Sequence, residues 1–124
     1  MRKKKDDNLP DLENTIIESI REKKGRNIIS IDLRLLNNSV CVYFVISHGD
    51  SNTQVRAIAE NIEQKVKKIL NLNVYHREGY ENAHWILLDY NTVVIHIFQE
   101  ETRRYYRLEE LWADGKFTIL EDIL

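Results

Sequence analysis

The sequence predicts an α+β fold in which a single mixed β-sheet packs against helices. Apolar runs typical of buried strands, residues 40–46 and 93–98, alternate with segments whose apolar residues recur every three or four positions. The segments follow in the order helix, two strands, helix, short strand, two strands, helix, which suits one sheet with helices against it. A length of 124 residues allows one domain with a core and is short for two.

The first eight residues, MRKKKDDN, are predicted to be a disordered tail because only Met1 among them is hydrophobic. No apolar region follows the basic residues, so the pattern does not indicate a secretion signal. No segment approaches the roughly 20 apolar residues of a membrane span. We therefore expect a soluble cytoplasmic protein. Its formal charge of -2 argues against binding that depends on wrapping nucleic acid.

A helix is predicted from Leu9, because Pro10 suits the first turn and Gly25 suits a left-handed C-cap. Its apolar stripe consists of Leu12, Ile16, Ile17 and Ile20. Residues 27–33 and 40–46 are predicted to form a hairpin with a turn around Asn37 and Asn38.

The second strand of that hairpin, VCVYFVI, is expected to be central and buried on both faces. Cys41 lies within it and is interpreted as a buried small hydrophobe, not a nucleophile. Residues 47–50 are predicted to form a loop. Ser51 and Gln54 then have the spacing of a capping box, which predicts a second helix that packs on the sheet. Residues 72–78 suit a short strand.

Residues 82–112 are the most informative part of the sequence. Their pattern predicts a strand, a tight turn, a second strand and a charged helix. Trp85, Leu87 and Asp89 share one face of the first strand, and Ile86, Leu88 and Tyr90 share the other. One face can therefore be core while the other is offered to a partner. The second strand, residues 93–98, is mostly apolar on both faces and is predicted to lie inside the sheet, with His96 as a core histidine.

Residues 100–112 are predicted to form one helix that ends before Gly115. The side chains expected to point inward are Tyr105, Leu108, Leu111 and Trp112, and those expected outward are Arg103, Arg104, Arg107 and Glu110. Residues 116–124 are predicted to be a C-terminal extension that folds back or pairs with a second copy.

The sequence offers little material for catalysis or for a cofactor. The four histidines and single cysteine lack metal-binding spacing, and no phosphate-binding glycine motif occurs. The alternative with some support is magnesium-dependent nucleotidyl transfer by Asp32, Asp50 and Asp89. It is weakened because the chain contains no D-x-D pair.

A protein-binding surface is the remaining hypothesis. An exposed Trp85 beside Asp89 has the composition of an interface hot spot, whereas the plain alternative is that Trp85 covers the sheet beneath a helix. Acidic residues gather in the second half of the chain and can attract a basic partner. They are Glu78, Glu81, Asp89, Glu100 and Glu101.

Three segments, EKKGRNIISIDLR, YFVISHGDSNTQVRAIAENI and REGYENAHWILLDYNTVVIHIFQEETRRYYRLEELW, resemble the ribosomal silencing factor family, also called the Iojap family. The resemblance covers residues 9–115 as one domain and implies a fold similar to nucleotidyltransferases without their catalytic carboxylates. It implies a non-enzymatic repressor that binds the large ribosomal subunit through its universal protein number fourteen and sterically blocks the small subunit. It leaves open an assembly role on the large subunit, and it permits a homodimer.

By the same resemblance, the expected contact residues are Trp85, Leu87 and Asp89, followed by Glu78, Tyr80, Tyr90 and Glu100. The chain departs from the family pattern at Val42, where an Asp is usual, and at Asn91 and Thr92, where a Gly-Asp turn is usual. Asn91 can still make a tight turn.

Overall fold

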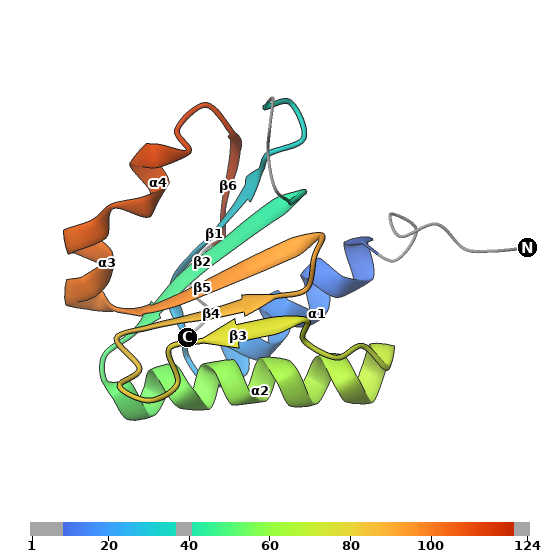
Figure 1. Cartoon of the computed structure of the whole chain (residues 1–124), viewed down its shortest axis with the longest axis vertical. Helices are drawn as coiled ribbons and strands as arrows, with labels where there is room; N and C mark the ends of the chain where they lie inside the picture. Colours follow the sequence, from blue (N-terminus) through green and yellow to red (C-terminus); the bar gives the residue numbers. More distant parts are fainter. Residues whose placement is uncertain (1–8, 37–40, 121–124) are drawn as a thin grey trace, which may run out of the picture.

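The computed structural model describes residues 9–36 and 41–120, and it confirms an α+β fold built on one mixed sheet (Figure 1). The helices are α1 (Leu9–Glu22), α2 (Asn52–Leu70), α3 (Glu100–Tyr106) and α4 (Leu108–Leu111). The strands are β1 (Arg26–Asp32), β2 (Tyr43–Gly49), β3 (His76–Glu78), β4 (Trp85–Asp89), β5 (Val93–Gln99) and β6 (Lys116–Leu120). The predicted tail, the predicted turn at Asn37 and Asn38, and the last four residues lie outside the described residues.

The sheet has the strand order β3-β4-β5-β2-β1-β6. β2 and β5 are parallel neighbours, and all other pairs are antiparallel. β5 therefore lies inside the sheet, as its apolar sequence predicts, and six of its seven residues are buried. The segment after Gly115 folds back, because β6 pairs with β1 through residues 116–120.

Helices α1 and α2 cover one face of the sheet and enclose the larger part of the core (Figure 1). The predicted cap of α2 is confirmed, because the Ser51 hydroxyl accepts the backbone N–H of Gln54 at 3.1 Å. The two helices are joined by buried Asn61, whose amide donates to the Ser19 carbonyl at 2.9 Å. A polar pair inside this interface satisfies groups that burial would otherwise leave unpaired.

The end of α1 differs from the prediction by one residue. Lys24, not Gly25, takes the left-handed conformation, with a φ of 62°. Gly25 instead allows close packing, because a Cβ there would collide with Cγ2 of Ile20. The predicted left-handed cap at Gly25 is therefore wrong, and close packing explains the glycine.

Helices α3 and α4 lie over the opposite face, and the single helix predicted for residues 100–112 is wrong (Figure 1). The helix breaks at Arg107, which has a φ of 50°. Leu108 is buried as predicted, but Tyr105 and Leu111 are 80% and 75% exposed. Because the helix axis changes direction at Arg107, the residues before and after it do not share one helical face. The predicted inward face is therefore not continuous.

The boundaries of two strands also differ from the prediction. β2 continues through residues 47–49, which were predicted to be a loop, because Ser47 and His48 are paired to β5 and buried. β3 is limited to His76–Glu78 instead of spanning 72–78. Cys41 is buried as predicted, and it packs with Phe44 in the smaller core beneath α4.

Candidate functional site

Strand β4 has the predicted alternation between a core face and an outer face. Ile86 and Leu88 are completely buried beneath α2, whereas Trp85, Leu87 and Asp89 are half-buried on the face that carries α3. Glu78 on β3 is the cross-strand neighbour of Leu87 and is exposed. We call Trp85, Leu87, Asp89 and Glu78 the β4 surface.

The β4 surface stays open because α3 and α4 cover other strands. Helix α3 contacts β5 and β2. Trp112, which follows α4, packs edge-on against Phe44 of β2 at 5.2 Å between ring centroids. Within the β4 surface, Trp85 has a ring contact with α3, since the Tyr106 ring lies 5.0 Å from it. An apolar strip at Leu87, flanked by two carboxylates, is therefore left accessible at one side of the sheet.

Trp85 combines the two roles that the sequence left open. It packs beneath Tyr106, and its indole N–H donates to Nδ1 of His96 at 3.1 Å. His96 is buried as predicted, and desolvation lowers its pKa to about 4, so its ring is neutral near pH 7. Trp85 is thus held rigidly while part of its surface remains accessible.

The acidic residues of the β4 surface have local structural partners. The Asp89 carboxylate accepts the backbone N–H of Asn91 at 2.7 Å. Asn91 has a φ of 71°, which confirms that it makes the tight turn into β5. The exposed Glu78 carboxylate lies 3.2 Å from Nε2 of His76. These contacts orient both carboxylates without burying them.

Tyr80, Tyr90 and Glu100 do not join the β4 surface in the structure. Tyr90 is 7% exposed and faces α1 and α2, on the same side as Leu88. The Tyr80 hydroxyl donates to Glu63 of α2, and burial with this contact raises its pKa. Glu100 begins α3 and lies 3.9 Å from the His48 ring. Strand parity explains Tyr90, because odd and even positions of a strand point to opposite faces.

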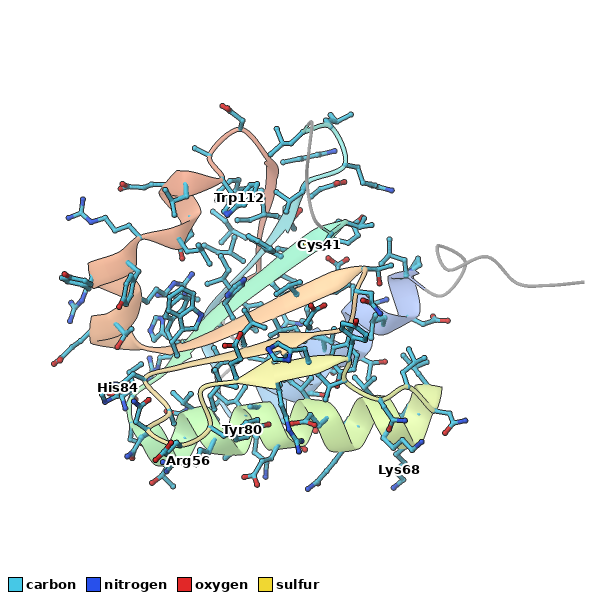
Figure 2. The ribbon with its side chains drawn as sticks, in the orientation of Figure 1. Cys41, Arg56, Lys68, Tyr80, His84 and Trp112 are labelled. Atoms are coloured by element: carbon cyan, nitrogen blue, oxygen red, sulfur yellow. The ribbon has the colours of Figure 1, made fainter. Side chains whose placement is uncertain are left out.

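The loop that leads into β4 is fixed by α2. The Arg56 guanidinium donates to the carbonyls of Tyr80 and Glu81 at 2.9 and 2.6 Å (Figure 2). Gly79 has a φ of 92°, and a Cβ there would collide with the carbonyl of Trp85. The loop therefore packs directly on the backbone of Trp85 and positions this end of the β4 surface.

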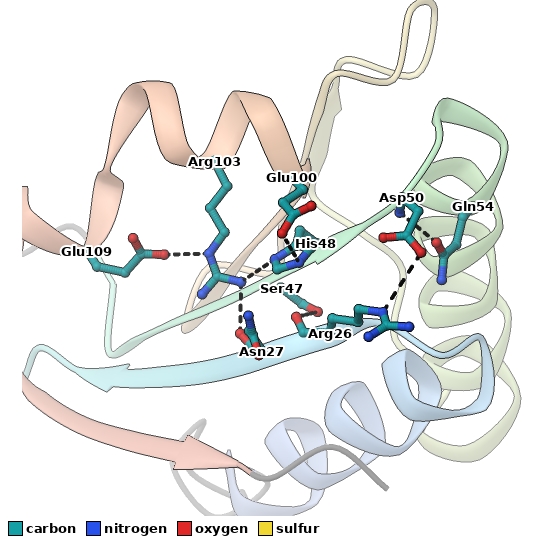
Figure 3. Close-up of polar contacts among 9 residues, drawn as sticks. All are labelled: Arg26, Asn27, Ser47, His48, Asp50, Gln54, Glu100, Arg103 and Glu109. Atoms are coloured by element: carbon teal, nitrogen blue, oxygen red, sulfur yellow. Dashed lines mark hydrogen bonds and ion pairs between the residues drawn. The ribbon is translucent and has the colours of Figure 1, made fainter. Parts of the chain in front are cut away.

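A buried arginine that sequence reasoning placed on the surface holds α3 to the sheet. Arg103 donates to Glu109 at 2.7 Å and to the carbonyl of Asn27 at 2.8 Å (Figure 3). Its guanidinium also lies 2.9 Å from Nδ1 of His48, and desolvation together with this positive charge lowers the pKa of His48. Its partners are far apart in the sequence, so no local pattern indicated this role.

A groove beside Trp85 was also missed. The groove lies between the segment from Asn82 to Trp85 and helix α3, and it has a volume of about 490 Å³. Tyr105 and Tyr106 line it, and Tyr105 is 80% exposed. The helical pattern had placed Tyr105 inward, so its availability to a ligand could not be predicted.

The three aspartates considered for magnesium binding are separated by the fold. Asp32 lies beside Tyr43 at the start of β2, whereas Asp50 follows the end of that strand. Seven extended residues separate the two by roughly 20 Å, far more than two carboxylates that share an ion. Asp32 pairs instead with Arg34 at 2.7 Å. Among residues 9–36 and 41–120, no group of three or more metal-ligating side chains is assembled.

None of the helices in the described part of the chain is both long and apolar enough to cross a membrane.

Comparison with known proteins agrees with this fold. The family model described as "Ribosomal silencing factor during starvation" matches residues 6–123. The chain is 36% identical to the ribosomal silencing factor RsfS of Bacillus subtilis, covering 81% of this chain and 83% of the relative. It is 28% identical to a mouse protein named "Mitochondrial assembly of ribosomal large subunit protein 1", covering 82% of this chain and 45% of that protein.

Solved structures show the same similarity. A crystal structure of a Chromobacterium violaceum protein superposes with a TM-score of 0.80 at 32% identity, covering 85% of this chain and 86% of that one. A Bacillus halodurans structure gives a TM-score of 0.77 at 30% identity, covering 90% of this chain and 99% of that one. The family match over nearly the whole sequence and the relatives at more than 30% identity lead to one conclusion: the chain belongs to the ribosomal silencing factor family.

Proposed function

We propose that this protein represses translation by binding the large ribosomal subunit through its universal protein number fourteen and sterically blocking the small subunit. The observation that carries the proposal is the β4 surface, where half-buried Leu87 lies between Glu78 and Asp89 on a part of the sheet that the helices leave open. Apolar area with an acidic rim complements a basic protein. Occlusion requires affinity and bulk but no turnover, so we propose no cofactor and no reaction.

The test is co-sedimentation with purified large subunits. Leu87→Lys places a positive charge in the centre of the β4 surface, and we expect it to weaken binding about tenfold or more, because like charges at an interface are repulsive. Ile69→Lys is the matched control, since Ile69 is 60% exposed on α2 and lies on the opposite side of the sheet. Adding small subunits should show that the bound wild-type protein prevents subunit joining.

Normal binding by folded Leu87→Lys would remove the β4 surface from the contact. Binding without any effect on subunit joining would instead refute the blocking step. Asp89→Asn separates charge from structure, because an asparagine oxygen can still accept the Asn91 N–H. We expect this variant to fold normally and to bind less tightly, with the largest difference at low salt.

A role in assembly of the large subunit is the second candidate, and the name of the mouse relative favours it. The same surface would serve both roles, so variants do not separate them. The distribution of the protein does, because an assembly factor is enriched on precursor particles and a silencing factor on mature large subunits. We propose that the protein acts in the cytoplasm. Gradient sedimentation of a lysate from growing cells measures how the protein is distributed between precursor particles and mature large subunits.

We also propose that a second copy can pair through β6. This strand is an edge of the sheet, and Ile119 on it is 73% exposed. Antiparallel pairing about Thr118 would place Phe117 opposite Ile119 of the second copy, an aromatic and β-branched pair that favours strand association. Such a dimer leaves the β4 surface free, because β6 and β4 lie toward opposite edges. Thr118→Pro should then yield only monomer in analytical ultracentrifugation, whereas an unchanged dimer would exclude this interface.

A further inference from the structure

The groove beside Trp85 has the chemistry of a site for a positive charge. The groove has a volume of about 490 Å³. It is lined on one side by Asn82 and His84 from the segment before β4, and on the other by Glu101, Tyr105 and Tyr106 of helix α3. His84, which is labelled in Figure 2, is exposed and lines the groove. The groove adjoins the β4 surface, because Trp85 belongs to both.

Glu101 and Tyr105 supply a carboxylate and an aromatic ring on one side of α3. They are four residues apart, so they neighbour each other on the helix surface. Tyr105 is 80% and Tyr106 is 51% exposed, and the two rings meet edge to face at 5.0 Å. Within the part of the chain that the structure describes, Glu101 has no ion pair or hydrogen bond from its side chain. Its charge is therefore available to a ligand.

The positive charges of this segment point elsewhere. Arg103, Arg104 and Arg107 line a separate cleft between α3 and the β1–β6 side of the sheet. No lysine or arginine of the described residues lines the groove beside Trp85. The arginines of α3 therefore line a different cleft from this groove, and Glu101 is the acidic side chain among the residues that line the groove.

We propose that this groove binds an arginine or lysine side chain presented by a basic ribosomal protein. A guanidinium or ammonium group would lie against the exposed Tyr105 ring and pair with the Glu101 carboxylate, combining a cation–π contact with a charge-assisted hydrogen bond. The inference rests on the proposed function for the identity of the partner. It extends the contact from β4 onto α3 and makes Glu101 and Tyr105 determinants of specificity.

The groove is tested directly with short peptides, independently of ribosomes. Acetyl-Gly-Arg-Gly-amide is titrated into the full chain while backbone amide and tryptophan indole shifts are followed by NMR. The citrulline peptide is the control, because citrulline has nearly the shape of arginine without its charge. We expect the arginine peptide to shift the amides of residues 82–85 and 101–106, with a Kd on the order of millimolar, and the citrulline peptide to leave them unchanged.

The role in partner binding is tested by sedimentation of Glu101→Gln and Tyr105→Leu with large subunits. Each is expected to weaken binding about fivefold, since one exposed cation–π or ion-pair contact contributes about 1 kcal/mol. Glu60→Gln and Tyr75→Leu are the matched controls, because both residues are exposed outside the groove. Variants that bind as tightly as wild type would overturn the assignment of the groove to the partner contact.

The outcomes distinguish this inference from the proposed function. If wild-type protein binds large subunits but neither peptide shifts the groove and both variants bind normally, the cation site is wrong and the ribosomal role stands. If wild-type protein does not bind large subunits while the arginine peptide shifts the amide signals of the groove residues, the proposed function fails. The cation site then stands, and its basic partner is not a ribosomal protein. Equal shifts with arginine and citrulline would overturn the requirement for positive charge.

Discussion

The indole N–H of Trp85 donates to Nδ1 of His96 at 3.1 Å, which joins a half-buried side chain of β4 to a buried side chain of β5. Accepting this bond requires an unprotonated Nδ1, so the neutral ring carries its hydrogen on Nε2. Protonation of Nδ1 would therefore break this hydrogen bond, which holds Trp85 of the β4 surface in place.

We expect the protein to lose stability as pH falls from 6.5 toward 4. Burial lowers the pKa of His96 from 6.5 to about 4, so the unfolded chain binds a proton in this window while the folded chain does not. The contribution is present above pH 6.5, and about 2 kcal/mol of it is lost between pH 7 and pH 5. His48, whose pKa is also lowered, acts in the same direction. Urea unfolding at the two pH values measures the change.

His96→Phe should reduce this pH dependence, whereas His84→Gln should preserve it because His84 is exposed. Wild-type stability that is equal at pH 7 and pH 5 would contradict the prediction.

Gly79→Ala should destabilise the loop that packs on Trp85. The residue has a φ of 92°, and an added Cβ would collide with the Trp85 carbonyl, which cannot move away as a flexible side chain would. We expect a loss of about 2 kcal/mol or more in the free energy of unfolding. Asn91→Gly is the control, since its φ of 71° suits glycine and its change should stay within about 0.5 kcal/mol. Equal stabilities for the two variants would refute this role of Gly79.

Arg103→Met should loosen α3 and α4 from the sheet. The substitution keeps an apolar stem but leaves the Glu109 carboxylate and the Asn27 carbonyl without their donors. We expect a loss of about 3 kcal/mol, because breaking a buried charge pair leaves the other charge uncompensated. Arg104→Met, at an exposed neighbouring position, should change stability by no more than about 0.5 kcal/mol. Thermal unfolding compares them, and similar melting temperatures would exclude a holding role for Arg103.

Cys41 should react slowly with thiol reagents while the protein is folded. It is 8% exposed, and desolvation raises the pKa of its thiol from 9.0 to about 11. At pH 8 the thiolate fraction falls about 100-fold, so labelling by a disulfide reagent should be at least about 100-fold slower than in urea. Comparable rates in the two conditions would show that Cys41 is accessible, contrary to the structure.

Local patterns were reliable where one short-range effect dominates. The Ser51 cap, the alternation of β4 and the interior position of β5 were predicted correctly. Each depends on spacing or on runs of apolar residues that read the same in any tertiary context. Strand and helix ends were less predictable, because Lys24 and Arg107 take left-handed conformations that the sequence did not indicate.

By itself, the sequence determined that this chain forms one mixed sheet with helices against it, and that Trp85, Leu87 and Asp89 share a strand face, because side-chain periodicity follows from backbone geometry. Only the tertiary structure decided which parts of that face stay open. The break at Arg107 exposes Tyr105, and Arg103 turns inward to reach Asn27, His48 and Glu109. Those outcomes depend on contacts between segments distant in the chain, whose energies no local pattern contains.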